Sequence, residues 1–243
     1  MFMKNILDQH AKAYEGQSQY DFDNAIMLKW YPLRIIEMTQ GADSLLELGV
    51  GHGYSTKIFS EHFSRHLVLD GSASVIERFK QEFPDCSAEI VKTCFEDFKS
   101  EEKFDVIVLG FVLEHVDNPF EILNIYRNFL SPSGKMYIAV PNAQALNRRL
   151  GHLAYILKDL QELSENDISL GHKRYYTVDS LLEEIRAANY ELERMEGIYL
   201  KPFTTQQIIS LKLDPKIINA LCLMGIEYPE LSCGILAELK PLA

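Results

Sequence analysis

A short apolar run followed by closely spaced glycines is the feature that most constrains this chain. Leu45–Gly49 reads as a buried strand that carries one carboxylate. Gly49, Gly51 and Gly53 then mark a turn, and Tyr54–Phe63 continues with helical spacing. Glycines allow positive φ angles and a close approach of the backbone to a ligand, while a helix N-terminus offers free N–H groups. Strand, glycine turn and helix together predict the start of an α/β nucleotide-binding site.

Strand-like and helix-like segments alternate after this turn. Further strands are expected at 66–70, 88–92, 104–110, 135–140, 190–199 and 232–239. Helical patterns separate most of them, which predicts an α/β fold with a doubly wound, mostly parallel sheet of seven strands. Ligands of such sheets bind outside the carboxyl ends of the strands.

The second expected strand ends in a carboxylate. Asp70 follows Gly49 by about 20 residues, where nucleotide-binding folds place an acid that binds ribose hydroxyls. Ser72 is expected to cap the next helix, and Thr177 to cap a later one.

The length of 243 residues suits a single domain, 1–243, with additions to the α/β pattern. We expect an N-terminal helical cap at 1–43, including a helix broken by Pro32, and two lid segments, 143–176 and 200–228, the first beginning with a helix at 145–163. The lid segments are expected to enclose an apolar acceptor pocket. Its expected lining is Leu146, Leu150, Leu153, Tyr155, Phe203, Met224 and Tyr228.

The charge balance excludes one large class of partners. The chain has 24 Lys and Arg against 35 Asp and Glu, a net charge of −11. Nucleic-acid binding depends on a basic surface, so no nucleic-acid partner is expected. The four cysteines form no CxxC pair, so no metal is expected and the thiols fit a reduced cytoplasmic setting. No signal peptide and no apolar run of about 18 residues is found, so no membrane span is expected, and a homodimer is compatible with the sequence.

Several ordered motifs carry a resemblance to a known family. Glu47–Gly53 reads ELGVGHG, and Asp70, Phe104–Ile107 (FDVI), Leu113–Val116 (LEHV) and Pro132–Lys135 (PSGK) follow in order. Over roughly 45–239 the chain resembles class I S-adenosylmethionine-dependent methyltransferases, most closely the ubiquinone-biosynthesis-type small-molecule branch. The resemblance implies a Rossmann-like fold, S-adenosyl-L-methionine as cofactor, S-adenosyl-L-homocysteine as product and a small-molecule acceptor.

The resemblance also implies cofactor contacts at particular positions. The residues expected around the methionine part are Glu47, Gly49, Gly51, Gly53 and Gly110, and Asp70 is expected to bind the ribose. The residues expected at the adenine are Gly71, Ser72, Phe95 and Glu96, and Tyr14 is expected to cover the cofactor. One departure concerns adenine recognition. Many relatives have an Asp that accepts a hydrogen bond from the adenine amino group, but the corresponding residue here is Cys94, a poor acceptor.

Two histidines are candidates for a general base. A base assists methyl transfer to an alcohol or a protonated amine, and His115 and His172 are both expected near the carboxyl ends of the strands. The alternatives are that His115 packs beneath the lid and that His172 lies on a solvated loop. Tyr175 and Tyr176 are expected to pack the lid. The acidic residues at 159, 162, 165 and 167 are read as a solvated helix face or as an attractor for a cationic amine.

Two other function classes were weighed. A nicotinamide-dependent oxidoreductase would need a third, helix-packing glycine where Tyr54 stands. A catalytically silent binding subunit would not need the intact glycine motif or Asp70. The sequence therefore predicts an S-adenosylmethionine-dependent methyltransferase that acts on an O or N atom of a small-molecule or sugar-containing acceptor with a His general base.

Overall fold

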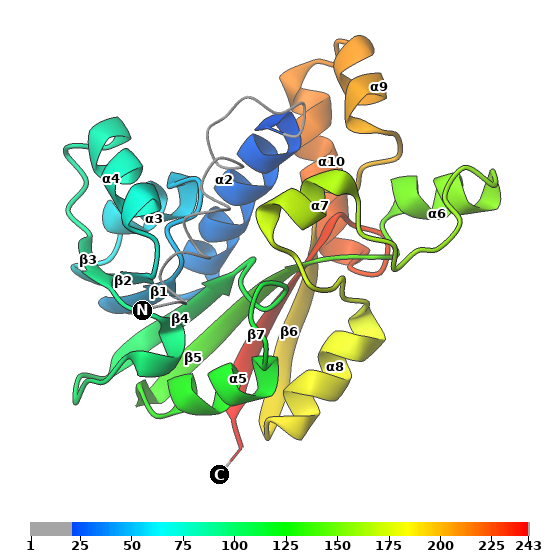
Figure 1. Cartoon of the computed structure of the whole chain (residues 1–243). Helices are drawn as coiled ribbons and strands as arrows, with labels where there is room; N and C mark the ends of the chain where they lie inside the picture. Colours follow the sequence, from blue (N-terminus) through cyan, green and yellow to red (C-terminus); the bar gives the residue numbers. More distant parts are fainter. Residues whose placement is uncertain (1–20, 243) are drawn as a thin grey trace.

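The computed structural model describes residues 21–242, and its centre is a seven-stranded sheet (Figure 1). The strand order is β3-β2-β1-β4-β5-β7-β6. All neighbours pair in parallel except β7, which is antiparallel to both β5 and β6. The strands are β1 (Ser44–Leu48), β2 (Arg65–Asp70), β3 (Glu89–Lys92), β4 (Phe104–Gly110), β5 (Leu130–Pro141), β6 (Tyr190–Ile198) and β7 (Gly234–Pro241). The predicted seven-stranded, mostly parallel, Rossmann-like sheet is therefore confirmed.

Helices cover both faces of the sheet. The helices are α2 (Asp21–Met38), α3 (Tyr54–Ser60), α4 (Ala73–Glu82), the 3-10 helix η2 (Phe95–Asp97), α5 (Pro119–Arg127), α6 (Leu146–Leu153), α7 (Glu165–Leu170), α8 (Val178–Ala187), α9 (Thr205–Ser210) and α10 (Pro215–Glu227). Buried side chains of α5 and α8 pack on one face, and those of α2, α3 and α10 pack on the other (Figure 1). This two-sided cover leaves the carboxyl ends of the parallel strands free to carry a site.

The alternation of side chains along the central strands explains the two layers of core. In β1, Leu46 and Leu48 face the α5/α8 layer, whereas Leu45 faces the α2/α3 layer. β4 follows the same rule, and its apolar residues are buried on both faces, as expected for a central parallel strand. β1 lies between β2 and β4, so the glycine turn after β1 is at the middle of the sheet edge.

Two local predictions are wrong. Helix α2 is continuous through Pro32, which is buried in its interior and does not break it. The helix expected over 145–163 ends at Leu153. A separate short helix, α7, follows, and Ser164 caps it by accepting a hydrogen bond from the Asp167 N–H.

Some expectations fall outside the described residues. Tyr14 and the first part of the N-terminal cap, 1–20, lie outside the range that the structure describes. Within 21–242, none of the helices combines the length and the apolar character needed to cross a bilayer.

Candidate active site

The glycine turn after β1 has the backbone conformation that its sequence predicts. Gly49, Gly51 and Gly53 have φ angles of 81°, 51° and 82°, in the left-handed region that favours glycine. The Gly49 N–H donates to the Leu69 carbonyl at 2.8 Å, which ties the turn to β2. A side chain at Gly49 would meet Val112, which follows β4, at 3.7 Å. The turn is therefore a backbone cradle at the edge shared by β2, β1 and β4.

Asp70 lies beside this cradle with a fixed orientation. Its carboxylate accepts the N–H of Val50 at 2.9 Å and the N–H of Ser72 at 2.8 Å. Ser72 caps α4 as predicted, accepting from the Val75 N–H at 3.2 Å. These bonds place a carboxylate next to the glycine turn in the position suited to a ribose diol.

Glu47 is directed into the protein interior. Ser55 Oγ donates to its Oε1 at 2.6 Å, and His66 Nε2 lies 3.1 Å from its Oε2. Both carboxylate oxygens therefore hold α3 and β2 against β1. The contact of Glu47 with the methionine part of a cofactor stays a prediction.

The other expected cofactor residues gather around the same edge. Phe95, in η2, lies against the glycine turn, with its Cζ 4.0 Å from the place that a side chain on Gly49 would occupy. Its carbonyl accepts the Tyr126 hydroxyl at 3.0 Å. Glu96 is exposed beside it. Gly110 leaves no room for a side chain, because the ring and hydroxyl of Tyr31 fill that space.

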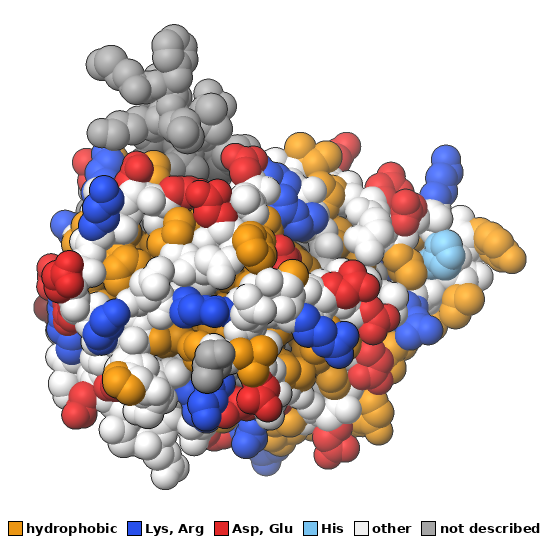
Figure 2. Space-filling model, turned by 90° about the horizontal axis from the view of Figure 1, so that it is seen from below, with side chains coloured by type: hydrophobic (Ala, Val, Ile, Leu, Met, Phe, Trp, Pro, Cys, Tyr) orange, Lys and Arg blue, Asp and Glu red, His pale blue; other side chains and the backbone are white. Residues whose placement is uncertain are grey.

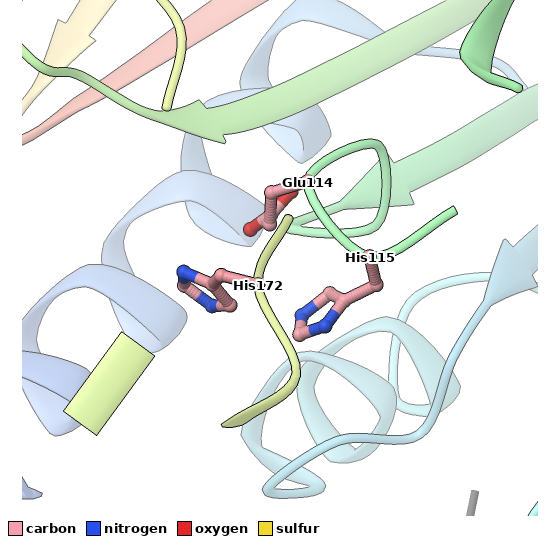
Figure 3. Close-up of side chains that lie close together, drawn as sticks. All are labelled: Glu114, His115 and His172. Carbon is pink, nitrogen blue, oxygen red and sulfur yellow. The ribbon is translucent and has the colours of Figure 1, made fainter. Parts of the chain in front are cut away.

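A second cluster lies beyond the end of β4. Glu114 and His115 belong to the loop after β4, and His172 to the loop after α7; their side chains converge (Figure 3). The two imidazole rings are 4.7 Å apart in an edge-to-face arrangement. The Lys173 N–H donates to the Glu114 carbonyl at 2.8 Å and joins the two loops. The structure thus brings together both histidines that the sequence singled out.

Asp167 holds one of these histidines. Its Oδ1 lies 3.2 Å from His172 Nδ1. Its Oδ2 accepts the Tyr175 hydroxyl at 2.7 Å and the Ser164 N–H at 2.8 Å. A carboxylate fixed in this way orients the imidazole and leaves Nε2 as the ring nitrogen that can exchange a proton.

The surroundings shift the pKa of all three titratable groups. Burial raises the pKa of Glu114 to about 7, because neither of its oxygens has a hydrogen-bond partner among the described residues. Burial alone would lower the pKa of His172, but Asp167 and the charge of Glu114 outweigh it, so that pKa is raised. Burial likewise opposes ionisation of Asp167, yet the bonds from His172, Ser164 and Tyr175 bring its pKa well below the usual range.

The same cluster has donor groups that a divalent cation accepts. Glu114, His115 and His172 each offer one ligand atom, and these atoms lie within 4.8 Å of one another. Carboxylate oxygen and imidazole nitrogen are common ligands of zinc and related ions. No metal was expected from the cysteine spacing, and these three ligand groups come together only through the fold of two loops.

The expected apolar pocket is wrong in its lining. Leu150, Leu153, Tyr155, Phe203, Met224 and Tyr228 are exposed to solvent in the structure. An enclosed pocket would require these side chains to be covered, so they cannot be its walls in this conformation.

Two residues of the cluster were missed from the sequence. The sequence did not single out Glu114 as a site residue, and it placed Asp167 on a solvated helix face or among acids that attract a cationic amine, whereas both side chains are buried. The signal for Asp167 was present: a Ser three residues before it completes a capping box, which directs the Asp side chain back toward the chain. Both tyrosines were expected to pack the lid; Tyr176 instead packs in the main core, and the Tyr175 hydroxyl supports Asp167.

Comparison with known proteins identifies the family. The family model described as "Methyltransferase domain" matches residues 20–194. A ubiquinone biosynthesis O-methyltransferase of Glaesserella parasuis is 24% identical over 226 residues, which cover 83% of this chain and 92% of that protein.

Solved structures share the fold. An S-adenosylmethionine-dependent methyltransferase from Mesorhizobium loti has a TM-score of 0.59 at 18% identity, covering 87% of this chain and 97% of that one. The N-methyltransferase NodS from Bradyrhizobium japonicum, in complex with S-adenosyl-L-homocysteine, has a TM-score of 0.59 at 15% identity, covering 97% of this chain and all of that one.

Proposed function

This chain belongs to the methyltransferase-domain family, as a class I S-adenosylmethionine-dependent methyltransferase, and we propose that it methylates a hydroxyl oxygen of a small molecule with His172 as general base. The observation that carries the proposal is the contact between His172 Nδ1 and the buried Asp167 carboxylate, at 3.2 Å, on the segment that a backbone hydrogen bond joins to the loop after β4. The cofactor supplies a methyl group already activated on a sulfonium, so the protein has to align the acceptor and take up its proton.

The glycine turn fits this cofactor. Three successive glycines with positive φ leave a backbone surface without side chains, and Asp70 presents a carboxylate whose position two backbone N–H groups fix. In the proposed complex Gly49, Gly51 and Gly53 lie along the methionine part and Asp70 accepts the ribose hydroxyls. Phe95 packs beside the adenine, and Cys94 leaves the adenine amino group to a backbone acceptor.

His172 has the attributes of a proton acceptor. Asp167 occupies the Nδ1 side, so Nε2 would be the atom that takes up the proton of the acceptor hydroxyl during methyl transfer. The imidazolium that results is stabilised by the charge of Asp167 on one side and by Glu114, when ionised, on the other. His115 packs edge-on against this ring and limits its movement.

Oxygen is favoured over nitrogen as the acceptor atom. A neutral amine can attack a sulfonium methyl without losing a proton first, whereas an alcohol gains from a base by roughly 10²–10⁴-fold. The ubiquinone biosynthesis O-methyltransferase of Glaesserella parasuis, at 24% identity, supports the same choice. The likeness to the N-methyltransferase NodS is one of fold.

The test combines cofactor binding with turnover. S-adenosylmethionine and NADH are titrated calorimetrically, and methylated products of phenols, alcohols, sugars and amines are sought by mass spectrometry. We expect binding of S-adenosylmethionine alone and methylation of a hydroxyl compound. His172→Ala should lower kcat by about 10²–10⁴-fold with unchanged cofactor affinity, while Tyr54→Phe, in α3, serves as the matched control and stays near wild type.

Several outcomes would contradict the proposal. Turnover of His172→Ala close to that of wild type rejects the base. Activity that EDTA abolishes and a divalent cation restores assigns Glu114, His115 and His172 to a metal site. Cofactor binding without turnover of any acceptor in the panel favours a binding subunit, and methylation of amines alone moves the assignment to nitrogen.

A further inference from the structure

The outer surface of the two lid segments is unusually apolar. Apart from Leu33, Phe120 and Leu242, every large apolar side chain exposed in the described part of the chain lies in them. The set is Leu150, Leu153, Tyr155, Ile156, Ile168, Phe203, Ile209, Leu211, Ile217, Leu223, Met224 and Tyr228. Figure 2 shows hydrophobic side chains on the part of the molecule that projects from the body. Exposed apolar patches of this extent mark interaction sites.

The turn after α6 forms a projecting tip. Leu153, Tyr155 and Ile156 are 73%, 95% and 83% exposed, and α6 with its following loop stands away from the body (Figure 1). The Tyr155 N–H donates to the His152 carbonyl at 3.0 Å, and the Ile156 N–H to the Gly151 carbonyl at 2.9 Å. Tyr155 has a φ of 61°, an unusual value for a bulky residue, so the backbone holds these side chains outward in a defined turn.

Helix α10 presents the second part of this surface. Cys222 and Gly225 pack inward against β6, while Ile217, Leu223 and Met224 face solvent. Backbone bonds hold the start of α6 against residues at the borders of the second lid segment, from the Leu146 N–H to the Leu231 carbonyl and from the Asn147 N–H to the Lys201 carbonyl. The base of α6 is therefore tied to the segment that carries α10.

The size of this surface matches a protein interface. With about 150–250 Å² for a large side chain, the exposed fractions of these side chains, taken together over both lid segments, amount to on the order of 1,000 Å². A stable interface buries about 800 Å² on each partner.

Charges at the two parts are complementary. Along α6 and the turn after it, Arg149, His152 and Lys158 are exposed and no acidic residue occurs between 149 and 158, while the exposed Asp159 follows this stretch directly. At the far end of α10, Glu227 and Glu230 are exposed, and no Lys or Arg occurs between 217 and 232. Lys216 and Asp214 balance each other at its start.

We propose that a second copy of this chain docks on the lid surface, so that the tip of each copy lies on α10 of the other. In a twofold dimer of this kind the same surface of each copy forms the interface. The basic tip of each copy then meets the acidic end of α10 of the other copy. An anionic bilayer is a less suitable partner for this surface, because the chain has a net charge of −11 and its surface away from the tip would be repelled by the lipid headgroups.

Sedimentation velocity of the full chain between about 1 and 100 µM tests the proposal. We expect a reversible dimer, and a Kd at least about tenfold weaker for Tyr155→Glu/Ile156→Glu and for Met224→Glu. These side chains are exposed, so circular dichroism should show unchanged folding. Phe120→Glu is the matched control, since Phe120 is 47% exposed on α5 outside the lid, and it should dimerise normally.

Three results would overturn the proposal. The first is a monomer throughout this concentration range. The second is a dimer that the two lid variants leave intact or that Phe120→Glu weakens equally. The third is a monomer that floats with phosphatidylglycerol vesicles through Tyr155 and Ile156, which would assign the tip to a lipid surface. Because the measurement reads mass, its outcome is independent of methyl transfer.

Discussion

Gly53 is the glycine of the cradle that the structure makes hardest to replace. It begins α3 with a φ of 82°. A Cβ at this position would lie 2.6 Å from Phe79 Cδ2 and 2.8 Å from Phe83 Cε2. Phe79 is buried in the core beneath the turn and cannot move away freely. Gly53→Ala therefore combines backbone strain with overpacking.

Matched glycines separate these two effects. Gly41 has a φ of 87°, and a Cβ there would meet nothing within 4 Å, so Gly41→Ala carries the strain alone. That strain is about 1–2 kcal/mol. Overpacking of a core typically adds about 1–3 kcal/mol, so Gly53→Ala should lose roughly 2–5 kcal/mol in total. For a chain of this size the extra loss corresponds to a Tm lower by roughly 2–12 °C than that of Gly41→Ala.

Thermal unfolding followed by circular dichroism measures the difference, with and without S-adenosylmethionine. Ligand stabilisation should be smaller for Gly53→Ala, because the displaced turn binds the cofactor less tightly. Gly51→Ala, with a φ of 51° and open space around a Cβ, should be less destabilised than Gly53→Ala. Equal Tm values for the Gly53→Ala and Gly41→Ala variants would refute the packing of Phe79 beneath the turn and the reasoning built on it.

Two further predictions concern pH and a buried ion pair. The pKa of His172 is raised and a general base must be neutral to act, so kcat/KM should rise with pH with an apparent pKa above 6.5. Asp167→Asn should shift this rise to lower pH. An unshifted rise would show that His172 is not the group that controls the pH profile. Lys201 Nζ lies 2.5 Å from Oδ2 of the buried Asp23. Lys201→Met should therefore lower the free energy of unfolding in urea by about 3–5 kcal/mol, and adding Asp23→Asn should restore part of this loss. If the double variant restores nothing, the pairing is contradicted.

The fold was predictable because its signals are local in the sequence. Glycines at 49, 51 and 53 admit few other backbone conformations, and an apolar run such as 104–110 is typical of a central parallel strand. Asp70 was found by its distance from the first glycine.

The lid was less predictable because tertiary contacts decide its backbone. Its apolar spacing continues past Leu153, but the Gly151 carbonyl accepts the N–H groups of both Ile156 and Leu157, which ends the helix. Pro32 shows the reverse case, since α2 continues through this buried residue although proline cannot donate the helical hydrogen bond. The sequence pattern predicted neither the end of α6 at Leu153 nor the continuation of α2 through Pro32.

The position of the proposed base, His172, depends on the folding of the lid, whereas the expected cofactor site does not. Most of the residues expected at the cofactor lie on loops that leave the strands directly, whereas His172 is placed by a chain of contacts within 143–176. Arg148 stacks on the Tyr175 ring, and its guanidinium donates to the carbonyls of Leu160 at 2.8 Å and of Glu162 at 2.9 Å. Tyr175 in turn supports Asp167, which orients His172. A change in the lid therefore reaches the base through Arg148 without altering the glycine turn, so acceptor choice and proton transfer can vary together on a constant cofactor site.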